Sequence, residues 1–296
     1  MKAVDKAIER IKWFVESAGR RVYLFFSGGR DSLALLALAS YLPSSIRRKI
    51  VVVYTELMGN TAWVNRDVAI RAASHAGFDS RLVVECRRDA CLRDVDLRDY
   101  NFLDIMSYSR KGRFFYEALV EYGPPVPVKS HGLWCRREFK TWKWLYLPRF
   151  PETLYSIVGL RRGESRLRAG LYRNYLAVNV LSRGSHKRLQ VMLLPIYDWS
   201  DGEVEDFVKE AGFGGFLEPY RVAGDSLNCV WCPFKSKDLF LRALVALRDR
   251  PEWGYPVALF LCRSFMRLRP GSDTFTHRIV EDARWACDEA GIDTDI

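Results

Sequence analysis

The sequence lacks the features of membrane-spanning and exported proteins. No stretch reaches the roughly 18 uninterrupted apolar residues that a membrane-spanning helix needs. A signal-peptide pattern is also missing, because Asp5, Glu9 and Lys12 interrupt the apolar residues of the N-terminal segment. We therefore expect a cytoplasmic protein that does not enter membranes.

Cysteine is scarce and irregularly placed. The 296 residues include seven cysteines, an odd number with uneven spacing. A chain of this length can bury enough apolar surface to fold without disulfides, so thiols or metal ligands are expected rather than a framework of bridges. For Cys86, Cys91 and Cys287 we expect reduced thiols that pack as small apolar groups.

Positive charge is in excess, with a formal net charge of +10 at pH 7. A positive surface attracts nucleotides, phosphates or nucleic acid and speeds their arrival. An alternative is that the arginines serve solubility or thermal stability through surface ion pairs. Charge alone does not choose between these two interpretations.

Apolar runs that alternate with helical patterns predict an α/β fold with a mostly parallel sheet. The expected strands cover residues 21–26, 50–54, 81–84, 154–158 and 189–194, and the expected helices cover residues 32–41 and 62–76. Residues 86–129 are expected to form a loop with one helix near residues 113–122. We predict a nucleotide-binding domain at residues 1–200 and a helical C-terminal lobe at residues 201–296.

A Ser-Gly-Gly-Arg-Asp-Ser turn at residues 27–32 joins the first expected strand to a helix. Its glycines let backbone amides approach an anion, and the helix N-terminus adds partial positive charge. Ser27 and Ser32 offer hydroxyl groups to phosphate oxygens, and Asp31 can favour the helix dipole or hold Mg²⁺. These features favour a phosphate-binding loop over a plain glycine turn.

Four segments resemble, in the same order, the phosphoadenosine phosphosulfate (PAPS) reductase branch of the ATP-pyrophosphatase superfamily. They are the loop at residues 27–32, the stretch from Trp134-Cys135 to Lys140, the Gly-Leu-Arg-Arg-Gly-Glu-Ser-Arg-Leu-Arg segment at residues 159–168, and the Leu-Pro-Ile-Tyr-Asp-Trp-Ser segment at residues 194–200. The resemblance covers about residues 20–235.

The resemblance implies a five-stranded, doubly wound sheet of Rossmann-like type that binds ATP or an adenylyl nucleotide with Mg²⁺. The nucleotide-binding residues that it implies are Ser27, Gly28, Gly29, Arg30, Asp31, Ser32, Tyr54, Thr55, Glu56, Gly159, Glu164 and Ser165. The catalytic residues that it implies, at the anionic end of the substrate, are Asp31, Lys140, Arg161 and Arg168. The alternative for the two arginines is a basic surface segment.

Cys229-Val230-Trp231-Cys232 is a Cys-x-x-Cys turn, whose thiolates select zinc or an iron–sulfur cluster. Two reduced thiols that pack as apolar groups are the alternative. The resemblance implies Cys135 as a third ligand and a [4Fe-4S] cluster, with Zn²⁺ as the alternative. Cys262 is the expected fourth ligand, while His131 and an open position are the other options.

Two departures from the family pattern count against reductase chemistry. Cys135 is followed by Arg136, whereas cluster-bearing members of the family have two adjacent cysteines there. Sulfonucleotide reductases attack the sulfate sulfur with a cysteine in a Glu-Cys-Gly tail, whereas this chain ends Gly-Ile-Asp-Thr-Asp-Ile.

Three functions remain open from the sequence. The first is an enzyme that adenylates an acceptor, with RNA as one candidate, releases pyrophosphate and then delivers sulfur. The second is a PAPS or adenylyl-sulfate reductase. The third is a non-catalytic nucleotide-binding subunit with a structural metal site. The sulfur donor and the oligomeric state stay open, with a homodimer as one option.

Overall fold

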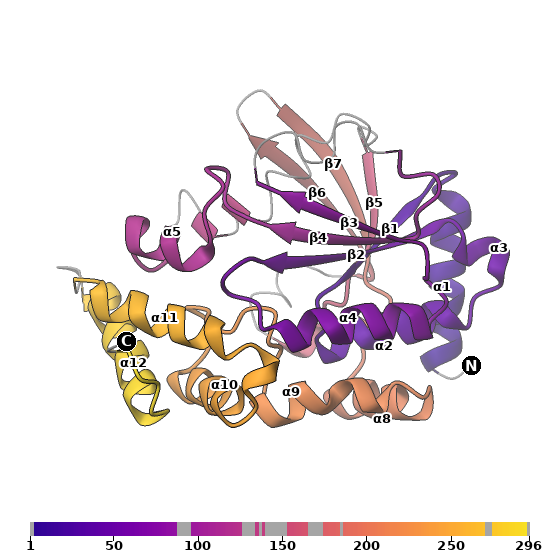
Figure 1. The fold of residues 1–296 in the computed structure, drawn as a ribbon. Coiled ribbons are helices and arrows are strands. Elements are labelled where there is room, and N and C mark those ends of the chain that lie inside the picture. Colours follow the sequence, from indigo (N-terminus) through magenta and orange to yellow (C-terminus); the bar gives the residue numbers. More distant parts are fainter. Residues whose placement is uncertain are drawn as a thin grey trace.

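Seven strands form one sheet in the order β3-β4-β2-β1-β5-β7-β6 (Figure 1). The computed structural model describes residues 3–87, 96–125, 134–135, 138–139, 153–164, 174–183, 186–269 and 274–294. The strands are β1 (Val22–Phe26), β2 (Ile50–Leu57), β3 (Arg81–Cys86), β4 (Phe102–Ser107), β5 (Thr153–Ile157), β6 (Leu176–Arg183) and β7 (His186–Leu193). All neighbours are parallel except β6 and β7, which form an antiparallel pair.

The α/β class and the mostly parallel sheet are confirmed, but the expectation of five strands is wrong. Strands β4 and β6 are the additional ones, and β4 lies inside residues 86–129, where a loop with one helix was expected. The apolar run of β4 is interrupted by Asp104, whose carboxylate is fully buried and accepts hydrogen bonds from Arg66. A buried ion pair of this kind is invisible in a local window of sequence.

The α-helices and short 3₁₀-helices alternate with the strands as far as β3 and dominate the chain after residue 200. The α-helices are α1 (Ala3–Ser17), α2 (Arg30–Ser40), α3 (Ser44–Arg47), α4 (Trp63–His75), α5 (Phe115–Tyr122), α8 (Asp201–Glu210), α9 (Glu218–Ala223), α10 (Lys237–Asp249), α11 (Tyr255–Arg267) and α12 (Thr274–Glu289). The 3₁₀-helices are η2 (Arg162–Glu164), η3 (Gly214–Leu217) and η4 (Pro251–Trp253). None of the helices described is long and apolar enough to cross a membrane.

The two faces of the sheet belong to different apolar clusters because side chains alternate along a strand. Val22, Leu24 and Phe26 of β1 pack in the main core with α1, α2, α4 and α8. Tyr23 and Phe25 point the other way, into a smaller cluster that includes residues of β2, β3 and β4. Figure 1 shows α2, α4 and α8 on one side of the sheet.

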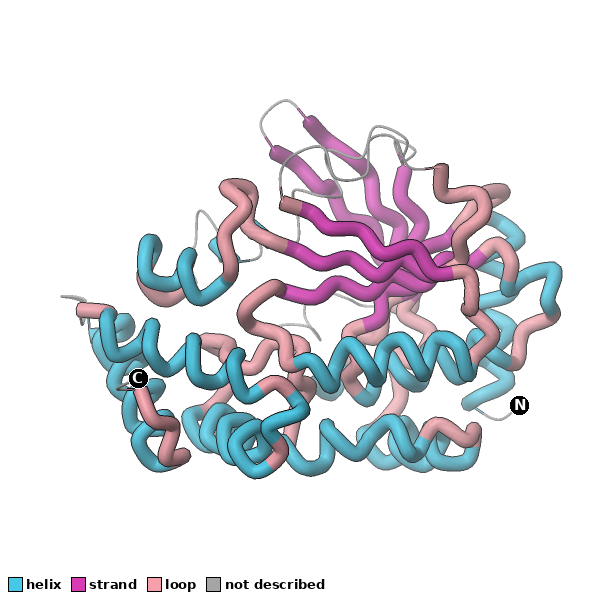
Figure 2. The backbone as a smooth tube through the Cα atoms, viewed as in Figure 1, coloured by secondary structure: helices cyan, strands magenta, loops and turns pink. Residues whose placement is uncertain are grey.

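A second large core lies among the helices at the end of the chain. Residues of α5, α10, α11 and α12 form it, together with Phe139, Trp231 and Trp253. Helix α8 instead contributes Val204, Phe207 and Val208 to the main core. Figure 2 shows the helices from α8 to α12 continuing along the same side of the sheet as α4. The division at residue 200 stays a prediction.

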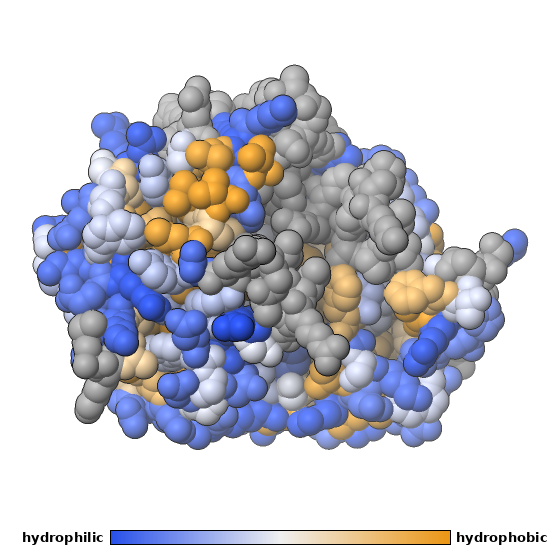
Figure 3. Space-filling view, turned by 180° about the vertical axis from the view of Figure 1, so that it is seen from behind, coloured by the Kyte–Doolittle hydropathy of each residue, from blue (hydrophilic) through white to orange (hydrophobic). Residues whose placement is uncertain are grey.

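Where it is described, the face in Figure 3 is mostly hydrophilic, with a compact hydrophobic region in the upper left and smaller hydrophobic groups right of the centre. Exposed apolar side chains on the β6–β7 hairpin include Val178, Val180 and Leu189, of which Val180 and Leu189 are paired across the strands.

Candidate active site

A cavity of about 750 Å³ opens where β1 and β5 end. In the strand order, the chain continues from β1 to β2 toward one edge of the sheet. From β5 it continues to β6 and β7 toward the other edge. This is a topological switch point, the place where parallel α/β sheets bind ligands. The lining residues are Phe25, Phe26, Ser27, Gly29, Arg30, Asp31, Ser32, Val53, Thr55, Val158, Gly159, Leu160, Arg161, Gly163, Asp201, Tyr220, Asp225, Ser226 and Asn228.

The loop between β1 and α2 forms the floor of this cavity. Gly28 has φ +76°, a left-handed conformation that glycine adopts without strain. Gly29 is the N-cap of α2 and provides no side-chain cap, so the first-turn amides of the helix have no capping side chain. The Ser32 hydroxyl donates to Gly29 O at 2.8 Å and lies 3.1 Å from the Ser27 hydroxyl.

Asn65 of α4, which sequence reasoning missed, braces this loop from behind. Its Nδ2 donates to Ser27 O at 3.1 Å and to the Tyr54 hydroxyl oxygen at 3.0 Å. A Cβ atom added at Gly28 would lie 2.7 Å from Asn65 Oδ1. The shape of the loop therefore depends on the missing side chain at Gly28 and on the amide of Asn65.

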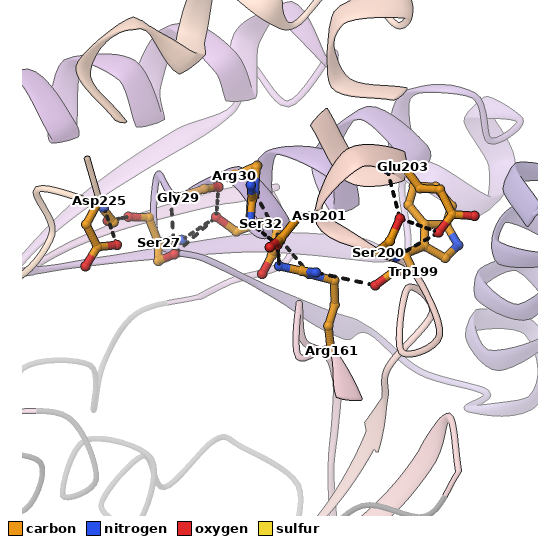
Figure 4. Close-up of polar contacts among 12 residues, drawn as sticks. Ser27, Gly29, Arg30, Ser32, Arg161, Trp199, Ser200, Asp201, Glu203 and Asp225 are labelled. Carbon is orange, nitrogen blue, oxygen red and sulfur yellow. Dashed lines mark hydrogen bonds and ion pairs between the residues drawn. The ribbon is translucent and has the colours of Figure 1, made fainter. Parts of the chain in front are cut away.

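The segment after β5 packs directly on the first turn of α2. A Cβ atom at Gly159 would lie 3.1 Å from the carbonyl carbon and oxygen of Asp31. Arg161, which is 4% exposed, reaches from this segment toward the loop (Figure 4). Its Nε donates to Asp31 Oδ1 at 2.9 Å and its Nη2 donates to Asp201 Oδ1 at 2.6 Å.

Four charged side chains thus meet at the cavity: Arg30, Asp31, Arg161 and Asp201. Arg30 also donates to the Asp201 carboxylate, and its Nε lies 3.8 Å from Asp31 Oδ1. The hydrogen bond from Arg161 lowers the pKa of the Asp201 carboxyl, against the effect of its partial burial, and Arg30 adds to the lowering. The sequence analysis did not predict Asp201 as a site residue, although it directly follows the Trp199-Ser200 segment.

At the end of β2 only part of the expected adenosine contact faces the cavity. Thr55 lines it, whereas Tyr54 and Glu56 project to the opposite face of the sheet because strand side chains alternate. Tyr54 is fully buried in the main core, and Glu56 is 4% exposed with its Oε2 lying 3.6 Å from Arg66 Nε. The contact of Tyr54 and Glu56 with an adenosine stays a prediction.

Glu56 sits in a buried polar cluster with Arg66 and Asp104. Burial raises the pKa of the Glu56 carboxyl to about 7, because desolvation outweighs the attraction of Arg66 and Asp104 adds to the rise. Arg66 meanwhile forms a two-pronged ion pair with Asp104, with Nε and Nη2 distances of 3.1 and 2.9 Å to Oδ2.

Several expected site residues fall outside the described residues: Lys140, Ser165, Arg168 and His131. Glu164 closes η2. Of the implied catalytic residues, the described part of the chain therefore brings together Asp31 and Arg161.

The described cysteines divide into those that form disulfides and those that do not. Cys262 of α11 forms a disulfide with Cys287 of α12, so the expected role of Cys262 as fourth ligand is wrong, as is the expectation of a reduced Cys287. A sulfur that is bonded to another sulfur is not a thiolate ligand. Cys86, also expected to be reduced, is likewise disulfide-bonded.

Cys135, Cys229 and Cys232 carry no disulfide. Cys135 and Cys229 pack against the same helical core, and Trp134 beside Cys135 stacks on Phe115 at 5.4 Å between ring centroids. The ring centroid of Phe115 lies 6.4 Å from that of Trp231, which stands between Cys229 and Cys232 in the sequence. Within the described residues, however, no three His, Cys, Asp or Glu side chains are grouped to hold a metal ion. The thiols are of the right chemistry for iron or zinc, but they are not arranged as a finished centre.

No family model, curated protein or solved structure matches the chain.

Proposed function

We propose that the cavity at the end of β1 binds ATP or an adenylyl nucleotide, and that the protein is an ATP-pyrophosphatase-type enzyme. The observation that carries the proposal is the cavity at the switch point, floored by a Gly-Gly loop and the uncapped N-terminus of α2. Backbone amides at such a helix start bind phosphate.

The walls of the cavity suit the two halves of a nucleotide. Phe25, Val53 and Leu160 offer apolar surface to a base, and Thr55 adds a hydroxyl. Arg30 and Arg161 lie at the phosphate end, where guanidinium groups bind phosphate oxygens bidentately. We infer that phosphate competes with Asp31 and Asp201 for these two arginines.

That exchange gives Asp31 a second role. Once a phosphate holds Arg161, the Asp31 carboxylate at the first turn of α2 is released toward the cavity. Mg²⁺, when bound, would neutralise phosphate charge there. The residues of the chain supply orientation and positive charge, which are the main needs of phosphoryl and adenylyl transfer.

We propose further that the enzyme adenylates an acceptor molecule, which then receives sulfur. RNA is one candidate acceptor, in keeping with the net charge of +10. Cys135, Cys229 and Cys232 are the proposed site of a [4Fe-4S] cluster, with Zn²⁺ as the alternative. The protein is proposed to be cytoplasmic.

The products of ATP turnover test the proposal. We expect pyrophosphate when ATP, Mg²⁺ and bulk RNA are supplied, because an acceptor oxygen attacks the α-phosphate and displaces pyrophosphate, and AMP when sulfide is also added, because sulfide then displaces the adenylate from the acceptor. ADP and phosphate would contradict it. Sulfite formed from adenylyl sulfate and a thiol reductant would favour the reductase alternative, which the remaining family motifs support. The Asp31→Asn variant should lose the product, and the Asp198→Asn variant, on the exposed segment before α8, should keep it.

A further inference from the structure

The wall of the nucleotide cavity continues directly into the Cys-x-x-Cys turn. Asp225, Ser226 and Asn228 line the cavity, and Cys229 follows at once. Lys235 closes the segment by donating from Nζ to Ser226 O at 2.9 Å, with Asp225 Oδ2 at 3.3 Å. Residues 225–235 thus form a closed loop with one end in the cavity wall and two thiols in its middle.

This closed loop is fastened to the turn that follows β2. Asn60, which is 1% exposed, uses both ends of its side-chain amide on one residue. Its Nδ2 donates to Trp231 O at 2.9 Å, and its Oδ1 accepts from Trp231 N at 3.0 Å. The backbone oxygen of Asn60 also accepts from Val230 N at 2.8 Å. The residues between the two cysteines are therefore held by three hydrogen bonds with Asn60.

Thr61 fastens the end of the loop that faces the cavity. Its hydroxyl donates to Asn228 O at 2.7 Å and accepts from Leu57 N at 2.9 Å, at the end of β2. Ser226 lies against the phosphate loop, since a Cβ atom at Gly29 would be 3.5 Å from Ser226 Cβ. Buried and satisfied networks of this kind have few alternative arrangements, so a shift at one end is transmitted to the other.

We propose that nucleotide binding and the state of the Cys229–Cys232 turn are coupled through residues 225–235, with Asn60 as the positioning residue. The inference rests on the proposed nucleotide site. Binding in the cavity orders Ser226 and Asn228, and the bonds of Thr61 and Asn60 pass that order to Val230 and Trp231. Linkage makes the effect reciprocal, so a change at the two cysteines alters nucleotide affinity by the same factor.

Hydrogen exchange of residues 225–235, followed by mass spectrometry with and without a non-hydrolysable ATP analogue, tests the coupling. This readout does not depend on whether the cysteines are free or metal-bound. We expect the analogue to slow exchange at the Val230 and Trp231 amides by about fivefold or more, the lower end of typical couplings. Calorimetry on the same samples reports whether the analogue binds.

Variants separate positioning from simple stability. In Asn60→Ala the analogue should still bind, while its effect on the Trp231 amide disappears, because alanine lacks the side-chain amide that bonds Trp231 but keeps the backbone oxygen that accepts from Val230 N. Thr61→Val, which keeps the shape but loses the hydroxyl, serves as a second test should Asn60→Ala fold poorly. Asn179→Ala on the distant β6 is the control and should keep the full response.

The outcomes are distinct. If calorimetry detects no binding to the wild-type protein, the proposed function falls and the coupling falls with it. If the analogue binds but exchange at residues 229–232 is unchanged, the coupling alone is wrong. A response that survives both Asn60→Ala and Thr61→Val overturns the role given to these residues.

Discussion

Glu56 is a buried carboxyl group whose neighbouring cation is already engaged by another carboxylate. Arg66 directs its hydrogen bonds to Asp104, and within the described residues Glu56 Oε2 accepts none. The pKa of Glu56 is therefore raised to about 7, mainly by desolvation. The carboxyl is then protonated in the folded state at pH values where the unfolded chain has lost that proton.

The sign of the resulting pH dependence follows from proton binding. Between pH 4.5 and 7 the folded state holds more protons at Glu56 than the unfolded state, so stability falls as pH rises through this window. The full loss is about 3 kcal/mol. In Glu56→Gln this loss should vanish. Urea unfolding at pH 4.5 and pH 7.5 measures the free energy of unfolding at the two pH values, with Glu9→Gln on the exposed side of α1 as the control. An equal change in this free energy between the two pH values for wild type and Glu56→Gln would contradict the account.

At the residue scale, the sequence indicated which motif residues gather at the cavity. The Gly-Gly loop, Asp31 and Arg161 meet there, as their residue types and spacing predicted. Asn65 and Asp201 could not be predicted in this way, since one is a single amide in the first turn of a helix and the other a helix-start acid. Their contacts join residues 38 and 40 positions apart, beyond any local pattern.

Among the elements, strands with uninterrupted apolar runs were the most predictable. β1 and β2 begin within a residue of the expected positions, because their apolar side chains fill both faces of the sheet. Strand β6 was missed because its outward side chains include Val178 and Val180, so its alternation is weak. Helix α1 was missed although Ala7, Ile11 and Phe14 have helical spacing.

Helices α11 and α12 are joined by the Cys262–Cys287 disulfide, whose two cysteines are 25 positions apart in the sequence. Closing a loop of this length restricts the unfolded chain and stabilises the protein by roughly 3 kcal/mol. Thermal unfolding of Cys262→Ala should show that loss, and adding a reductant should lower the midpoint of the wild-type protein by more than that of the variant, which retains the disulfide of Cys86. Equal midpoints with and without reductant in the wild type would argue against the bridge.

The three cysteines that carry no disulfide lead to a separate prediction about metal. After anaerobic purification we expect iron and sulfide in the wild-type protein, and their loss in Cys229→Ala and Cys232→Ala. Cys262→Ala should retain them, because its sulfur is engaged by Cys287. Zinc without sulfide would support the alternative metal, and equal metal content in all variants would refute ligation by this turn.

At the scale of the whole molecule, the sheet and the two cores meet at one place. The main core positions the loop between β1 and α2, and the helical core carries the Cys-x-x-Cys turn. Residues 225–228 belong to the cavity wall between them. Sequence patterns predicted both motifs but not their junction, because it is made by contacts between residues more than 160 positions apart.

The central claim, nucleotide binding at the β1–α2 loop, is tested most directly by calorimetric titration of ATP into two glycine variants. Gly28 and Gly19 both have positive φ, +76° and +62°, but a Cβ atom at Gly19 meets nothing within 4 Å, whereas one at Gly28 lies 2.7 Å from Asn65. Both alanine variants bear the same backbone cost, and only Gly28→Ala displaces the brace of the loop. We predict that Gly28→Ala loses ATP affinity by about tenfold or more, about 1.4 kcal/mol, and that Gly19→Ala loses none. Equal ATP affinity in the two variants and the wild type, or no binding to any of them, would contradict the account.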